Sequence, residues 1–91
     1  MKVRATLSAL QFKDILSHGH RSVEIDVPEG AKVRDVLKAL SGRVGKDVEE
    51  FLRDKKMVCL FRNKVLQYPK EGEEEVREGE SLIFINPFIG G

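Results

Sequence analysis

The sequence predicts a single α+β domain, and three patterns lead to this prediction. Apolar and polar residues alternate over residues 2–7 and 21–27, as in strands with one face on a core and one in water. Apolar residues within 33–40 have the spacing of one helix face. Residues 81–85 form a nearly continuous apolar run, typical of a buried strand. A chain of 91 residues can build one modest core but no second domain.

The first 27 residues are expected to form a hairpin with a wide loop. Residues 2–7 and 21–27 would be its two strands. Within the loop, Phe12, Ile15 and Leu16 have helical spacing, which favours a short turn packed under the sheet.

Two helical segments should follow, after the turn residues Pro28-Glu29-Gly30. The first, over residues 33–40, is expected to end at Gly42. The second covers residues 48–52 and has Asp47 near its start, where the positive end of a helix favours an acid. Both helices can cover one face of a sheet.

The second half of the chain should supply three strands. Residues 57–61 suit a third strand, and residues 65–67 a brief fourth after a turn at 62–64. Residues 68–80 read as a solvated connection with Val76 as its inward anchor. The final strand, 81–85, is so uniformly apolar that it should lie in the middle of the sheet, buried on both faces.

The residues after this strand are predicted to carry the function. Proline has no amide hydrogen for a sheet ladder, so the domain should cover residues 1–86 and a flexible tail residues 87–91. The extended tail would reach on the order of 16 Å, at roughly 3.3 Å per residue. Phe88 and Ile89 are apolar, and Gly90 and Gly91 have no side chains to obstruct a narrow channel. The sequence ends on the carboxylate of Gly91.

Composition excludes several classes of function. The 16 basic and 15 acidic residues give a net charge of +1, which argues against binding to nucleic acid or to an anionic membrane surface. One cysteine cannot form an internal disulfide or a four-cysteine cluster, which favours a reducing cytoplasm. Neither a signal peptide nor a membrane span is expected. The many Lys and Glu residues and the few Asn and Gln hint at a thermophilic source.

No set of residues predicts independent catalysis. The sequence has no Ser/His/Asp constellation and no phosphate-binding loop, so neither an activity of the isolated chain nor a stably bound cofactor is expected. Cys59 lies in an apolar run and should be a buried hydrophobe, in preference to a sulfur-relay thiol. His18 and His20 have no third ligand nearby, which favours a surface loop over a metal site.

The element order and the ending Leu82-Ile83-Phe84-Ile85-Asn86-Pro87-Phe88-Ile89-Gly90-Gly91 resemble the MoaD/ThiS-like ubiquitin-fold sulfur carriers. Within that family the likeness is greatest to the small subunit of molybdopterin synthase, MoaD, and it covers the whole chain. It implies a β-grasp fold, with a mixed sheet of four to five strands packed against one or two helices. Asn86 departs from the pattern, because the family commonly has the first of two prolines there.

The resemblance also implies a mechanism. A terminal carboxylate has a pKa of about 3.5 and is a poor electrophile, so it must be activated. A MoeB/ThiF-like adenylating enzyme would use ATP to adenylate Gly91, and a sulfur nucleophile would convert the adenylate to a thiocarboxylate. Inserted into a MoaE-like large subunit of molybdopterin synthase, the tail would donate its sulfur for the molybdenum or tungsten cofactor. Gly90 and Gly91 would form the reacting end, and Pro87, Phe88 and Ile89 would contact the partners.

Three other functions remain open from sequence. The activated Gly91 could instead be captured by a lysine, which would make the protein a ubiquitin-like modifier of other proteins. The sulfur could go to thiamin synthesis or to tRNA thiolation. The chain could also be a non-catalytic β-grasp binding module whose last residues have no chemical role.

Overall fold

The computed structural model describes residues 1–15 and 21–87, which form one mixed sheet covered by helices. The sheet has five strands in the order β2-β1-β5-β3-β4. Strands β1 and β5 run parallel, and the other neighbours are antiparallel. The elements are β1 (Lys2–Leu7), η1 (Leu10–Phe12), β2 (Ser22–Asp26), α1 (Val33–Val44), α2 (Val48–Arg53), β3 (Val58–Phe61), β4 (Lys64–Val65), η2 (Lys70–Glu73) and β5 (Ser81–Ile85).

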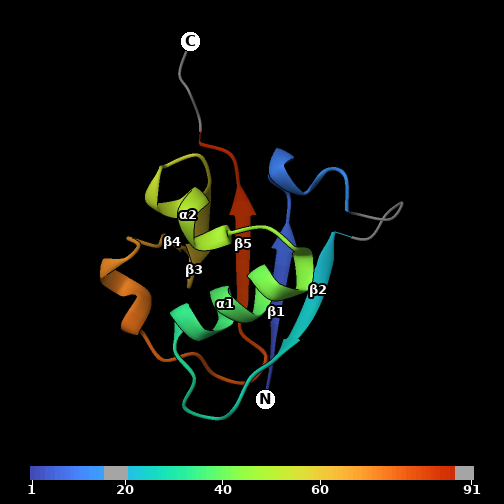
Figure 1. The fold of residues 1–91 in the computed structure, drawn as a ribbon. Coiled ribbons are helices and arrows are strands. Elements are labelled where there is room, and N and C mark those ends of the chain that lie inside the picture. Colours follow the sequence, from blue (N-terminus) through green and yellow to red (C-terminus); the bar gives the residue numbers. More distant parts are fainter. Residues whose placement is uncertain (16–20, 88–91) are drawn as a thin grey trace.

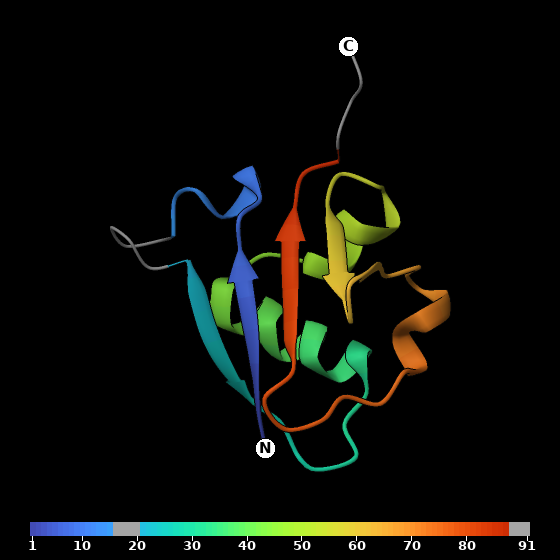
Figure 2. The same cartoon turned by 180° about the vertical axis from the view of Figure 1, so that it is seen from behind.

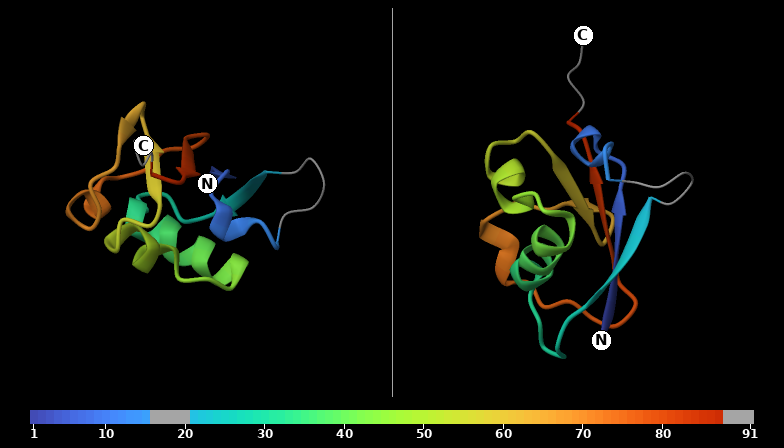
Figure 3. Two further views of the ribbon diagram at one scale, coloured as in Figure 1. Left: turned by 90° about the horizontal axis from the view of Figure 1, so that it is seen from above. Right: turned by 45° about the vertical axis from the view of Figure 1, so that its right-hand side comes forward.

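Both α-helices lie on one face of the sheet. In Figure 1 they lie in front of the strands, and in Figure 2 the sheet stands in front of them. Figure 3 shows the sheet and the helices as two layers. The other face of the sheet is not covered by an element of the described chain, so the core occupies the space between the helices and one face.

The predicted hairpin at the amino terminus is confirmed. β1 pairs antiparallel with β2, with Lys2 opposite Asp26 and Thr6 opposite Ser22. The inward residues of β1 are buried, as their alternation predicts, and Phe12 in η1 is also buried. Ile15, the second apolar residue of the predicted turn, is 40% exposed, so its predicted packing under the sheet is wrong. Leu16, the third, lies outside the described residues.

The strand β5 lies in the centre of the sheet, as predicted, but its predicted burial on both faces is wrong. Leu82 and Phe84 face the helices and are completely buried, whereas Ile83 faces outward and is 37% exposed. The reason is that the helices cover only one face. Ile83 and Ile85 are apolar but lie on the uncovered face, so the sequence pattern wrongly predicted burial on both faces.

The first helix ends later than its sequence suggests. α1 continues through Gly42 to Val44, and Gly45 ends it in a left-handed conformation, with φ 71°. The Gly45 amide donates to the Ser41 carbonyl at 2.9 Å, which is the usual geometry of a glycine-terminated helix. A glycine inside a helix costs only about 1 kcal/mol, so Gly42 does not stop it.

The second helix begins as predicted. The Asp47 carboxylate accepts a hydrogen bond from the Glu50 amide at 3.0 Å, so it satisfies one of the free amides at the start of α2. The brief fourth strand covers residues 64–65 in place of the expected 65–67, and Leu66, which follows it, is buried and donates its amide to the Cys59 carbonyl at 2.8 Å. Val76 is buried and anchors the connection that precedes β5, as predicted.

We expect substitutions on the two faces of β5 to differ strongly in cost. Phe84 is buried and packs edge to face on Phe12, with ring centroids 6.2 Å apart, so Phe84→Ala should lower the free energy of unfolding by about 3–5 kcal/mol. Ile83→Ala, one residue away on the open face, should cost about 1 kcal/mol. Urea denaturation of both variants measures the difference, and similar losses would contradict the one-sided burial of β5.

Candidate functional site

The candidate site is the root of the tail, where the chain leaves the sheet. β5 ends at Ile85, and Asn86 and Pro87 follow it in half-buried positions. Strand pairing therefore stops before the proline, as its missing amide hydrogen predicts. This root and the amino terminus lie at opposite ends of the molecule (Figure 1). The predicted site residues Phe88, Ile89, Gly90 and Gly91 lie outside the described residues, and the boundary between domain and tail at 86/87 stays a prediction.

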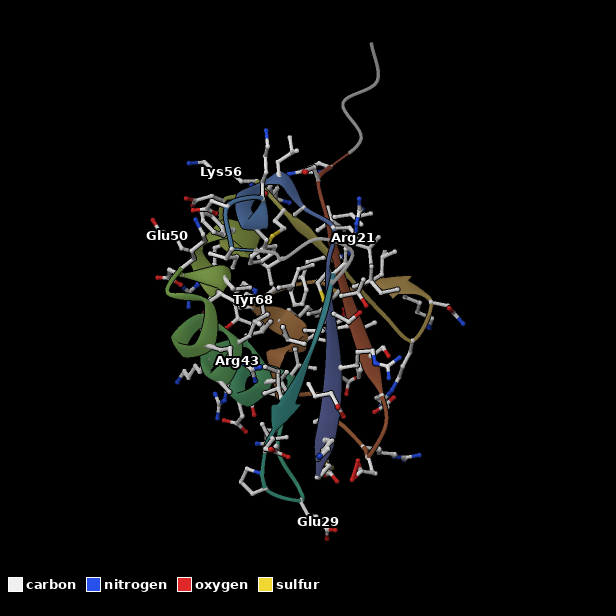
Figure 4. All side chains as sticks on the ribbon, turned by 90° about the vertical axis from the view of Figure 1, so that its right-hand side faces the viewer. Arg21, Glu29, Arg43, Glu50, Lys56 and Tyr68 are labelled. Carbon is white, nitrogen blue, oxygen red and sulfur yellow. The ribbon has the colours of Figure 1, made fainter. Side chains whose placement is uncertain are left out.

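Asn86 joins the tail root to two neighbouring segments. Its Oδ1 accepts a hydrogen bond from the Leu10 amide at 2.7 Å, and its Nδ2 donates to Gln11 Oε1 at 2.9 Å. Gln11 Nε2 in turn donates to the Lys56 carbonyl at 2.9 Å. η1 and the connection between α2 and β3 lie on either side of the upper end of β5 (Figure 2), and Lys56 lies at the same end of the molecule as the tail root (Figure 4).

The sequence alone did not reveal this network. Asn86 is separated from Leu10 and Gln11 by 76 and 75 residues, so only the folded sheet brings them together. The one signal available was the asparagine itself, a residue with both a donor and an acceptor placed immediately after an apolar strand.

The open face of the sheet carries a strip of apolar side chains that leads to the tail root. Leu60 lies opposite Ile83 and Val65, and Val58 lies opposite Ile85. All five side chains are partly or largely exposed, because they point away from the helices. The other half of this face is polar and carries residues from β1 and β2, among them Lys2, Arg4, Thr6, Ser22, Glu24 and Asp26. An apolar strip with a polar border is typical of a surface that binds another protein.

A hollow of about 260 Å³ lies between this strip and the tail root. Its wall includes Met57, Val65, Leu66, Tyr68 and Pro87. The hollow is small, its wall also contains Lys55 and Gln67, and no acidic side chain of the described residues lines it. It can accept an apolar side chain but supplies no reaction chemistry of its own.

Cys59 and Tyr68 are not activated nucleophiles. Cys59 is buried in β3, as predicted, and burial raises the pKa of its thiol to about 12. Burial and a hydrogen bond to Glu49 likewise raise the pKa of Tyr68 to about 12. At neutral pH both groups are therefore protonated, and neither has the lowered pKa that is typical of an activated nucleophile.

Two further expectations concern metals and membranes. Within residues 1–15 and 21–87, the histidine, cysteine and acidic side chains do not gather in groups of three or more that could bind a metal. The predicted loop residues His18 and His20 lie outside these ranges. Neither α1 nor α2 has the length and apolar character needed to cross a bilayer.

Comparison with known proteins agrees with this geometry. The model of the ThiS family matches residues 3–91. An uncharacterized protein of Archaeoglobus fulgidus is 33% identical over 91 residues, and the match covers 100% of both chains.

Two solved structures have the same fold. Small archaeal modifier protein 1 from Haloferax volcanii superposes with a TM-score of 0.72 at 24% identity, over 100% of both chains. A candidate molybdopterin converting factor, subunit 1, from Pyrococcus furiosus superposes with a TM-score of 0.69 at 23% identity, over 97% of this chain and 99% of the other. At these identities the likeness establishes the fold.

The fold and the exit of the last strand define a small ubiquitin-like protein with a β-grasp fold, which confirms the predicted fold class. The chain belongs to the ThiS family.

We expect Cys59 to be inert toward thiol reagents in the folded protein. With a pKa of about 12, only about one thiol in ten thousand is ionised at pH 8, and the side chain is also completely buried. An aromatic disulfide reagent should therefore label the native chain very slowly and the urea-unfolded chain at once. Rapid native labelling would contradict this and would restore Cys59 as a candidate sulfur-relay thiol.

Proposed function

We propose that the protein is a cytoplasmic sulfur carrier that holds sulfur as a thiocarboxylate on Gly91, and that it acts as the small subunit of a molybdopterin synthase. The observation that carries the proposal is the exit of the central strand: β5 delivers Asn86 and Pro87 to one end of the domain, beside the apolar strip of the open face. The family match continues from there through Gly91.

The chemistry would take place on the carbon of the Gly91 carboxylate. A MoeB/ThiF-like adenylating enzyme would let this carboxylate attack the α-phosphate of ATP, with release of pyrophosphate. A hydrosulfide-equivalent nucleophile would then attack the acyl carbon, and AMP would leave with the carboxylate oxygen. The thiocarboxylate would enter a MoaE-like large subunit and donate its sulfur to a pterin, for a molybdenum or tungsten cofactor.

The described residues suit the role of a carrier that presents its end to other enzymes. Cys59 and Tyr68 stay protonated at neutral pH, so the acids and bases would come from the partners. The apolar strip offers a docking surface from which residues 87–91, when extended, would span on the order of 16 Å. Docking on the strip and insertion of the tail would then occur together, which raises the effective concentration of the carboxylate at the reaction site.

We expect deletion of Gly91 to abolish activation. The measurement is ATP-pyrophosphate exchange, catalysed by the host's adenylating enzyme with the full chain as the substrate. Removing one residue shortens the reach by about 3.3 Å and should lower the rate by at least about a hundredfold. Gly42→Ala, an exposed helical position within α1 where an added Cβ meets no other atom, serves as a control that should preserve the exchange rate. Undiminished exchange without Gly91 would rule out the carrier function.

The second candidate function is that of a protein modifier. The superposition on small archaeal modifier protein 1 covers both chains completely, which favours keeping this candidate. Both functions begin with the same adenylate on Gly91. They differ in the attacking atom, which is sulfur in a carrier and the amine nitrogen of a target lysine in a modifier.

Mass spectrometry of protein from the native host should separate the two fates. For a carrier, we expect the intact chain to contain sulfur in place of one oxygen at Gly91, because the thiocarboxylate persists until a synthase accepts its sulfur. For a modifier, trypsin-digested host proteins would show lysines that carry a remnant of the tail. Abundant remnants without any thiocarboxylate would contradict the carrier proposal.

A further inference from the structure

The three hydrogen bonds that run from Leu10 through Asn86 and Gln11 to Lys56 form a relay, which begins where the backbone hydrogen bonds of β5 end. On the side of β5 that faces β1, the last backbone hydrogen bond runs from the amide of Ser8, just after β1, to the Phe84 carbonyl at 2.9 Å. Two residues later the Asn86 side chain accepts from Leu10, so it continues this attachment past the end of the strand. On the other side, the pair of Val58 and Ile85 is the last in the ladder.

The two ends of the relay fix its direction. The Leu10 amide can only donate and the Lys56 carbonyl can only accept. Between them, Asn86 and Gln11 must each accept with the oxygen and donate with the nitrogen, in one order. A carboxylate at either position cannot donate, so one hydrogen bond would break while the size of the side chain is nearly unchanged.

The position of the relay links it to the tail. The ring of Pro87 holds φ near −65°, so the direction in which the chain continues depends largely on the backbone of Asn86. The relay holds that residue against η1 on one flank and, through Gln11, against the connection between α2 and β3 on the other.

We propose that Asn86 is a positioning residue, which sets the direction of the tail and therefore how often Gly91 reaches the adenylation site of a docked partner. This inference rests on the proposed function. Docking through the apolar strip would determine KM, because the side chains of the strip take no part in the hydrogen bonds of the relay. The relay would determine kcat, because it governs the fraction of docked complexes in which the carboxylate is correctly placed.

The test is ATP-pyrophosphate exchange by the host's adenylating enzyme, with the concentration of the full-length carrier varied. We expect Asn86→Ala and Gln11→Glu each to lower kcat about tenfold and to leave KM within about twofold of the wild type. Amide hydrogen exchange should show faster exchange at Leu10 in Asn86→Ala, because its acceptor is gone. Asn63→Asp is the matched control: it is exposed in the β3–β4 turn and should leave both constants unchanged.

A purely structural role gives a different result. If the relay only stabilises the fold, the variants reduce the amount of folded substrate, which raises the apparent KM and lowers the melting temperature while kcat at saturation stays at the wild-type value. That outcome overturns the inference and leaves the proposed function standing. Absence of exchange with the wild-type chain would overturn the proposed function and the inference with it.

Discussion

The pairing of β5 with both of its neighbours is the interaction on which the rest of the structure depends. The sheet consists of two antiparallel pairs, β1 with β2 and β3 with β4, and β5 lies between them. Its parallel ladder with β1 and its antiparallel ladder with β3 make one sheet of these pairs. Because the candidate site follows directly on β5, the strand that completes the core also fixes the place where the chain leaves it.

The two faces of β5 have different roles: one contributes to the stability of the core, and the other forms part of the exposed apolar strip. Leu82 and Phe84 contribute to the core under the helices, while Ile83 and Ile85 belong to the apolar strip on the open face. Residues that alternate in this way can change independently, since a substitution on one face leaves the other in place. A partner that docks on the strip would therefore contact the strand from which the tail emerges without disturbing the buried face.

Local sequence patterns predicted most of the fold, and the failures came from information that is not local. The hairpin, the first helix face and the central place of the last strand follow from periodicity and composition. The burial of Ile83 was overestimated because a strand's sequence does not state which faces the helices will cover. The first helix was expected to end at Gly42 but ends at Gly45, because Gly42 keeps a helical backbone and the left-handed turn comes three residues later. The contact of Asn86 with Leu10 and Gln11 joins residues about 75 positions apart, which only the β1–β5 pairing brings together.

The ordered root of the tail reduces the entropy cost of binding that a carrier ending in glycines would otherwise have. Glycines suit a narrow channel because they lack side chains, but fixing their backbone costs more conformational entropy than fixing any other residue, and each ordered residue costs about 1–2 kcal/mol. Asn86 and Pro87 are already held by the relay and by the proline ring. Under the proposed function, a partner would therefore bind a tail whose root is already held in place, and burial of the apolar Phe88 and Ile89 in that partner would offset part of the entropy cost.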